Sequence, residues 1–288
     1  MTKEFDFLNI IQSIIQSEYL GDDCAYLKEY GLTISSDSLV EDVHFSRAFM
    51  TPYEIGKKAL LVNVSDILAS GAKPKFATIN LSGKLDNDFI CEFYKGLMIV
   101  ANEFDIKIIG GDLVGGDKLN ISITVFGDTK ERNISSRKNA KNGYVVAVCG
   151  EFGSSAQGLE DLKNKKDTYF AKYHKEPKLY PEVSENIAKN VKKPYAMMDS
   201  SDGLFDCLYQ ISNKSNVCLK IDYDLIPKKI NDKNLVLYGG EDYALVVCLD
   251  EEDFKKTTGL TKIGFCADGQ GVIIDNKKME YKGFEHFE

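Results

Sequence analysis

Apolar residues recur at helical spacing in several long stretches of the chain, and short apolar or alternating runs lie between them. The helical spacing predicts an amphipathic helix over residues 5–17 and further helices over 52–70, 89–104, 187–191 and 204–211. The short runs predict strands over residues 25–27, 32–34, 76–81, 106–109, 119–125, 144–149, 195–198, 217–221 and 244–249. Strands alternating with helices are typical of an α/β protein.

Acidic residues mark both ends of the first predicted hairpin. Asp22 and Asp23 precede its first strand, and Ser35, Ser36 and Asp37 follow its second. The hairpin would bring both ends to the same edge of a sheet. Crowded carboxylates resist desolvation unless a cation lies between them, and hydroxyl and carboxylate oxygens suit hard cations such as magnesium. A solvated acidic turn is the simpler alternative.

The helix predicted over residues 52–70 has the clearest ends in the chain. Thr51, Pro52 and Glu54 form a capping box with proline at the first helical position, and Gly71 ends the helix. Its interior is apolar almost all round, which predicts burial on most faces. Asp66 interrupts that apolar surface, and a buried carboxylate is costly unless it is paired or metal-bound. Asp66 is therefore a candidate site residue, or else a structural cap for a neighbouring loop.

Two further acidic motifs follow predicted strands. Gly110, Gly111 and Asp112 come directly after the run 106–109, where a glycine pair lets the backbone approach a ligand closely. Asp199, Ser200, Ser201 and Asp202 occupy a turn between a strand and a helix. Many ordinary turns resemble the first motif, and Ser201 or Asp202 could simply cap the helix that follows.

The polar stretch over residues 128–142 is predicted to cross between two domains. It concentrates positive charge, so it is either a solvated linker or a place where Arg137 reaches an anionic phosphate. The glycine loop over residues 150–155 is not a phosphate-binding Walker A loop, because no Gly-Lys-Ser/Thr sequence closes it.

Length and charge limit the classes of function. The 288 residues suffice for one large domain or two of average size. The net charge of −8 disfavours nucleic acid or an anionic membrane as the main partner. No apolar run spans a membrane and the start has no signal-peptide pattern, which predicts a cytoplasmic protein. The seven scattered cysteines form no C-x-x-C pair and are predicted to be buried reduced thiols.

Six acidic motifs occur in one order along the chain. They are Gly-Asp-Asp at 21, Ser-Ser-Asp at 35, Asn-Val-Ser-Asp at 63, Gly-Gly-Asp at 110, Asp-Ser-Ser-Asp-Gly-Leu at 199 and Gly-Gly-Glu-Asp-Tyr at 239. Each motif is weak alone. As an ordered set covering nearly the whole chain, they resemble the thiamine-monophosphate kinases of the aminoimidazole-ribonucleotide-synthetase-like ATP-binding superfamily.

The resemblance implies a two-domain, PurM-like α/β (α+β) architecture. Residues 1–140 would form an N-terminal sheet with flanking helices that binds ATP and magnesium, and residues 141–288 a C-terminal α/β domain. The protein would be a homodimer through the N-terminal sheet. It would transfer the γ-phosphoryl group of ATP to thiamine monophosphate, giving thiamine diphosphate. Such a transfer depends on in-line positioning and charge neutralisation, which carboxylates supply through metal ions.

The resemblance also implies roles for individual residues. Several magnesium ions would be held by Asp23, Ser35, Ser36, Asp37, Asp66, Asp112, Asp199 and Asp202. ATP would be contacted by Tyr94, Gly111, Asp112, Arg137 and Ser201. The thiamine substrate would be contacted by His44, Glu241 and Phe284.

The chain departs from the family pattern at a few places, among them Asp42, Leu113-Val114 and Ala244. Two alternatives remain open at this stage. One is another ATP-using synthetase of the superfamily; a selenophosphate synthetase would need a reactive cysteine with a lysine near the N-terminus, and only Cys24 lies there. The other is a nucleotide- or metal-binding module without turnover.

Overall fold

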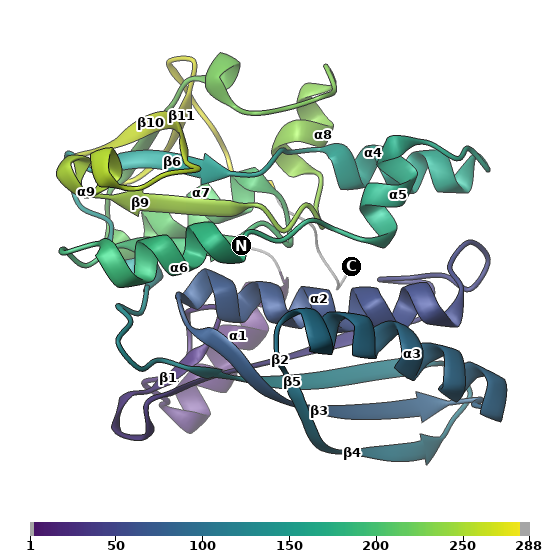
Figure 1. The fold of residues 1–288 in the computed structure, drawn as a ribbon. Coiled ribbons are helices and arrows are strands. Elements are labelled where there is room, and N and C mark those ends of the chain that lie inside the picture. The colour runs from purple at the N-terminus through teal and green to yellow at the C-terminus, as the bar shows by residue number, and fades with distance from the viewer. Residues whose placement is uncertain (1–2, 283–288) are drawn as a thin grey trace.

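The computed structural model describes residues 3–282 and contains two β-sheets with helices between and around them (Figure 1). The first sheet has five strands in the order β1-β2-β5-β3-β4, with β3 and β4 parallel and the other pairs antiparallel. The elements of this half are α1 (Lys3–Ile15), β1 (Ala25–Leu27), β2 (Leu32–Val40), α2 (Pro52–Ser70), β3 (Lys73–Gly83), α3 (Asn87–Glu103), β4 (Lys107–Gly115) and β5 (Asn120–Asp128).

The second sheet has seven strands in the order β12-β11-β8-β10-β6-β9-β7. Its elements are β6 (Val145–Cys149), α4 (Ser154–Lys163), α5 (Tyr169–Lys175), α6 (Pro181–Asn190), β7 (Ala196–Asp199), α7 (Leu204–Ser215), β8 (Cys218–Ile221), α8 (Lys233–Tyr238), β9 (Leu245–Leu249), α9 (Glu251–Lys256), β10 (Thr261–Ala267), β11 (Gly271–Ile274) and β12 (Lys277–Lys278). The mixed α/β fold predicted from the alternation of strands and helices is confirmed.

Helix α2 lies between the two sheets (Figure 1). The predicted capping box is present, with Thr51 accepting the N–H of Glu54, and Gly71 ends the helix in the left-handed conformation. The apolar side chains of α2 belong to the core of the first half, and Ala69 packs in a cluster with β7 and β9 of the second. Contacts on both sides explain why the helix is apolar almost all round.

Two predicted strands are longer than their apolar runs. β2 continues through Val40, and β4 continues through Gly115. The prediction that the Ser-Ser-Asp and Gly-Gly-Asp motifs follow the strands is therefore wrong, because both motifs lie inside them. Ladder pairing decides the difference, since β2 pairs with β5 along its full length and β4 pairs with β3 up to Gly115. The short helices α5 and α9 were not predicted, because each spans less than two full turns of periodic pattern.

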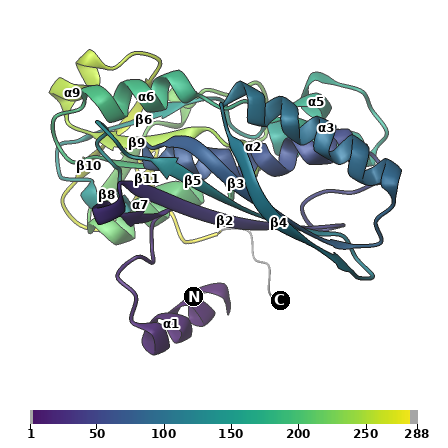
Figure 2. The ribbon, with the colours of Figure 1, turned by 60° about the horizontal axis from the view of Figure 1, so that its bottom comes forward.

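The predicted N-terminal helix is present as α1, and it lies away from the two sheets (Figure 2). Its apolar side chains remain exposed, from 44% at Phe7 to 74% at Ile14. Amphipathic spacing thus predicted the helix correctly without indicating what its apolar face would pack against. Within residues 3–282, no helix is long and apolar enough to span a bilayer.

Helices α2 and α3 cross at two glycines. A Cβ atom on Gly96 would lie 1.9 Å from the carbonyl oxygen of Tyr53, and one on Gly56 would lie 2.0 Å from that of Phe93. We therefore expect Gly96→Ala to lower the free energy of unfolding by about 1–3 kcal/mol, the usual cost of overpacking. Thermal and urea melts would measure the loss.

Gly110→Ala is the matched control, because a Cβ atom there would meet nothing within 4 Å. Its unfolding free energy should stay within about 0.5 kcal/mol of wild type. Equal destabilisation by both substitutions would contradict the close helix crossing.

Candidate active site

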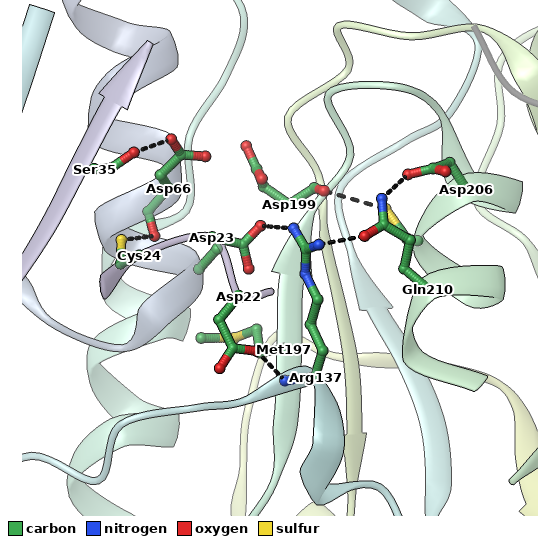
Figure 3. Close-up of polar contacts among 12 residues, drawn as sticks. Asp22, Asp23, Cys24, Ser35, Asp66, Arg137, Met197, Asp199, Asp206 and Gln210 are labelled. Atoms are coloured by element: carbon green, nitrogen blue, oxygen red, sulfur yellow. Dashed lines mark hydrogen bonds and ion pairs between the residues drawn. The ribbon is translucent and has the colours of Figure 1, made fainter. Parts of the chain in front are cut away.

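Three aspartates from distant parts of the chain meet at the junction of the two halves (Figure 3). Asp23 lies just before β1, Asp66 lies in the last turns of α2, and Asp199 ends β7. One carboxylate oxygen of each lies within 4.8 Å of the other two. Asp199 is buried, and the other two are half-buried. We call these three residues the aspartate cluster.

The aspartate cluster is electrostatically unfavourable on its own. Burial, followed by the charges of Asp37 and Asp199, raises the pKa of Asp66 well above its usual value. Burial and the charge of Asp23 raise the pKa of Asp199 to about 8. Like charges held together in a poorly solvated place favour a bound proton or cation. The oxygen-only donor set fits a hard divalent cation such as magnesium.

Hydroxyl groups from neighbouring elements donate to the aspartate cluster. Ser35 on β2 hydrogen-bonds Asp66, and Ser65 on α2 hydrogen-bonds Asp199. Asp37, also on β2, lies close enough that its charge helps to raise the pKa of Asp66. The carboxylate of Asp66 thus meets side chains of β2. This arrangement differs from the alternative in which Asp66 caps a loop by accepting backbone N–H groups.

Arg137 provides the positive charge beside the aspartate cluster (Figure 3). Its Nη2 lies 2.8 Å from Asp23 Oδ1, and its Nη1 hydrogen-bonds the side-chain oxygen of Gln210. Gln210 in turn donates to Asp206 at 2.6 Å. The Nε of Arg137 is buried and has no hydrogen-bond partner among residues 3–282. The Arg137 side chain is therefore held beside the aspartate cluster and is not that of a solvated linker residue.

The Asp199-to-Asp202 motif lies in the turn between β7 and α7. The N-cap of α7 is Gly203, so the alternative that Ser201 or Asp202 is the N-cap residue is wrong. Backbone hydrogen bonds tie the turn to the segment before β9. The N–H of Glu241 donates to the Ser201 carbonyl at 2.6 Å, and that of Tyr243 donates to the Ser200 carbonyl at 3.0 Å. These bonds hold Glu241 against the turn that follows Asp199.

His44 and Glu241, both expected at the substrate, are connected through a buried lysine. The Nζ of Lys58 lies 2.9 Å from Glu241 Oε1 and donates to the carbonyl oxygen of His44 at 3.2 Å. Burial is the largest single effect on Glu241 and favours its neutral form, but Lys58 and the two neighbouring histidines together outweigh burial and lower the pKa of Glu241. The Nδ1 of His44 accepts the N–H of Val40 at 3.0 Å, which anchors the ring to the end of β2.

Tyr94, Gly111 and Asp112 do not join the aspartate cluster within one chain. Gly111 pairs with Ile79 on β3, which pairs across β5 with Asp37 on β2. Three strand spacings therefore separate Gly111 from Asp37, roughly 14 Å. Asp112 is exposed and accepts the N–H of Leu113 at 2.9 Å. Tyr94 lies on α3, and Phe284 lies outside the described residues.

Sequence reasoning missed Lys58, His174 and Asp242. Lys58 is fully buried on α2, and His174 on α5 lies with its Nδ1 3.5 Å from Glu241 Oε2. The carboxylate of Asp242 accepts the N–H groups of Gly153 and Ser155 at 2.6 and 2.9 Å, which fixes the start of α4. A lysine inside an apolar helix was the available signal for Lys58, but its partners come from other parts of the chain.

The fold and the N-terminal sheet define a protein of the AIR synthase related class. The family model described as "AIR synthase related protein, N-terminal domain" matches residues 21–129. The thiamine-monophosphate kinase of Aquifex aeolicus is 33% identical over 302 residues, covering 99% of this chain and 98% of that protein. The enzyme of the same name from Bacillus subtilis is also 33% identical, over 99% of each chain.

A solved structure described as "AaThiL complexed with AMPPCP and TMP" matches with a TM-score of 0.91. It is 31% identical, and the match covers 99% of this chain and 97% of that one. The chain belongs to the thiamine-monophosphate kinase family. The resemblance inferred from the ordered acidic motifs is thereby confirmed.

We expect Asp66→Asn to stabilise the protein in the presence of a chelator. A raised pKa in the folded state means that protonated carboxyls favour folding. The contribution of the aspartate cluster to wild-type stability should therefore be greatest below the unfolded aspartate pKa of about 3.9 and be lost as the pH rises to about 8, the folded pKa of Asp199. Asp66→Asn should melt several degrees higher than wild type at pH 8 and show a flatter pH dependence.

Melting curves with and without magnesium check this expectation. Magnesium should raise the melting temperature of the wild type, and much less that of Asp66→Asn, because only the wild type presents the full charge. Equal destabilisation of the variant with and without the ion would contradict a cation-binding role for Asp66.

Proposed function

We propose that this protein transfers the γ-phosphoryl group of ATP to thiamine monophosphate and forms thiamine diphosphate, with magnesium required. The observation that carries the proposal is the aspartate cluster, which lies at the junction of the two halves in a chain of this family. Phosphoryl transfer needs little covalent chemistry from the protein, and charge neutralisation with in-line positioning supplies most of the rate.

Asp23, Asp66 and Asp199 would hold magnesium, with Asp37 beside them. When bound, magnesium neutralises phosphate charge and orients the reacting oxygens. Ser35 and Ser65 orient Asp66 and Asp199 by hydrogen bonds. The remaining metal positions from the sequence, Ser36, Asp112 and Asp202, stay part of the proposal.

At the nucleotide end, Arg137 and Ser201 would contact ATP. Arg137 already lies beside the aspartate cluster, and a guanidinium group is well suited to pair with phosphate oxygens. At the acceptor end, His44, Glu241 and Phe284 would contact thiamine monophosphate. An ionised carboxylate at position 241 suits the N–H groups of an aminopyrimidine ring or a cationic thiazolium.

We also propose a homodimer through the N-terminal sheet. Strand β4 is an edge strand, and its apolar side chains are largely exposed: Ile109 57%, Leu113 60% and Val114 52%. An exposed apolar edge strand invites pairing with another chain. A second copy is also the partner through which Tyr94, Gly111 and Asp112 could reach a nucleotide at an aspartate cluster that is distant within their own chain.

The proposal includes the division of the chain into residues 1–140 and 141–288. It is supported by the two sheets, which draw their strands from either side of the loop between β5 and β6. A cytoplasmic location is also proposed, and it is supported by seven cysteines that are all free thiols.

The purified protein with ATP and magnesium should release ADP only when thiamine monophosphate is added, and the product should be thiamine diphosphate by mass spectrometry. Thiamine should be a poor acceptor, because it lacks the terminal phosphate oxygen that acts as nucleophile. Asp66→Asn should reduce turnover by orders of magnitude.

Turnover of thiamine but not of its monophosphate would exclude the proposed acceptor. ATP binding with no turnover of either would instead favour a nucleotide-binding module.

Light scattering after size-exclusion chromatography should show a dimer for the wild type. Leu113→Lys should shift the protein toward monomer, because it places a charge on the exposed apolar edge of β4. Leu225→Lys is the matched control, since Leu225 is 49% exposed but lies in the second half of the chain. A monomeric wild type, or a dimer that Leu113→Lys leaves intact, would contradict an interface at β4.

A further inference from the structure

Lys58 is a charged side chain buried in the middle of α2. It is 0% exposed and lies directly before the apolar stretch that begins at Ala59. An ammonium group removed from water is costly unless it is paired and hydrogen-bonded. Two groups meet that need: the carboxylate of Glu241 at 2.9 Å and the carbonyl oxygen of His44 at 3.2 Å.

These two groups come from different halves of the molecule. His44 follows β2 of the first sheet, whereas Glu241 precedes β9 of the second. Lys58 therefore joins two segments that are proposed to contact the same substrate molecule. One ammonium group contacts both segments and thereby sets the distance between His44 and Glu241. Helix α2, which carries this group, packs against both halves of the molecule.

The backbone around Glu241 is also held tightly. Glu241 has a φ of 63°, in the left-handed region that non-glycine residues rarely adopt. Its N–H donates to Ser201, and the next residue, Asp242, accepts two N–H groups at the start of α4. A strained conformation that several contacts impose is typical of a functional position.

His174 lies near the second carboxylate oxygen of Glu241 but supplies little charge. Its Nδ1 is 3.5 Å from Glu241 Oε2 and 2.9 Å from the hydroxyl of Ser155. Burial, reinforced by Lys58, lowers the pKa of His174 to about 4, so the ring is neutral near pH 7. The positive charge that keeps Glu241 ionised thus comes mainly from Lys58.

We propose that Lys58 is a positioning residue for the acceptor substrate, which holds Glu241 as an ionised hydrogen-bond acceptor at a fixed place relative to His44. This inference rests on the proposed function. Lys58 acts through Glu241 and His44 and not on the reacting phosphates. Without it, burial would favour the protonated form of Glu241, which could no longer accept hydrogen bonds with both oxygens.

The test is a double-mutant cycle with Lys58→Met, Glu241→Gln and the double variant. Each single variant should raise the KM for thiamine monophosphate at least tenfold and leave the KM for ATP within twofold. In the Glu241→Gln background, Lys58→Met should have no further effect on the KM for thiamine monophosphate, because the two residues act as a unit.

Lys57→Met is the matched control on the same helix. Lys57 forms an ion pair with Glu176 just beyond α5, so it also links the two halves, but through a different carboxylate from the one that Lys58 contacts. Its KM values should equal those of the wild type. A tenfold rise in its KM for thiamine monophosphate would overturn the specific role of Lys58.

Melting curves without ligand address the possibility that Lys58→Met simply folds poorly. Each single variant leaves the other residue without its partner, so the double variant should melt higher than either. Its KM for thiamine monophosphate should nevertheless stay as high as that of Glu241→Gln. If the KM values of Lys58→Met match wild type while its melting temperature falls, Lys58 has only a structural role and the inference is wrong.

The outcomes separate this inference from the proposed function. A wild type that does not turn over thiamine monophosphate overturns the function, whereas an active wild type with additive effects in the cycle overturns only the role of Lys58. The melting cycle needs no substrate. Independent, additive changes in melting temperature would overturn the coupling of Lys58 to Glu241 in either case.

Discussion

The repulsion among poorly solvated carboxylates at the junction of the two sheets is the constraint on which the rest of the structure depends. Asp23, Asp66 and Asp199 come together although burial raises the pKa of all three, and neighbouring carboxylates raise those of Asp66 and Asp199 further. Serine hydroxyls and Arg137 offset part of that cost. The folded chain keeps this unfavourable arrangement because the strands and helices that carry the aspartates are fixed by their own packing.

Helix α2 is the element that makes such packing possible. It contributes Asp66 to the aspartate cluster and Lys58 to the acceptor end, so the two ends of the proposed site are held at a fixed separation along one helix. Close backbone contact with α3 at Gly56 and Gly96 restricts its position on one side. Contacts with the second sheet restrict it on the other, as Ala69 in its last turn shows.

Asp66 and Lys58 on α2 carry opposite charges, and each has negatively charged neighbours, so the consequences differ. At Asp66 the surrounding charges are negative, which favours a cation. At Lys58 the neighbouring charge is the carboxylate of Glu241, so the pair is satisfied within the protein. A kinase that binds a metal-nucleotide complex at one end and an organic acceptor at the other needs this difference, because the first end must attract external charge and the second must present a defined hydrogen-bonding surface.

The sequence alone determined the mixed α/β class, the limits and cap of α2, the family, and Asp66 as an exceptional residue, since periodicity, capping and ordered motifs are local properties. It did not determine that the Ser-Ser-Asp and Gly-Gly-Asp motifs lie inside strands, because ladder pairing sets strand length. Nor did it show that Gly111 lies three strand spacings from Asp37. The sequence shows Lys58 inside an apolar helix but does not show its role. A buried charge is explained by its partners, and His44 and Glu241 become its partners only when the two halves of the chain fold against each other.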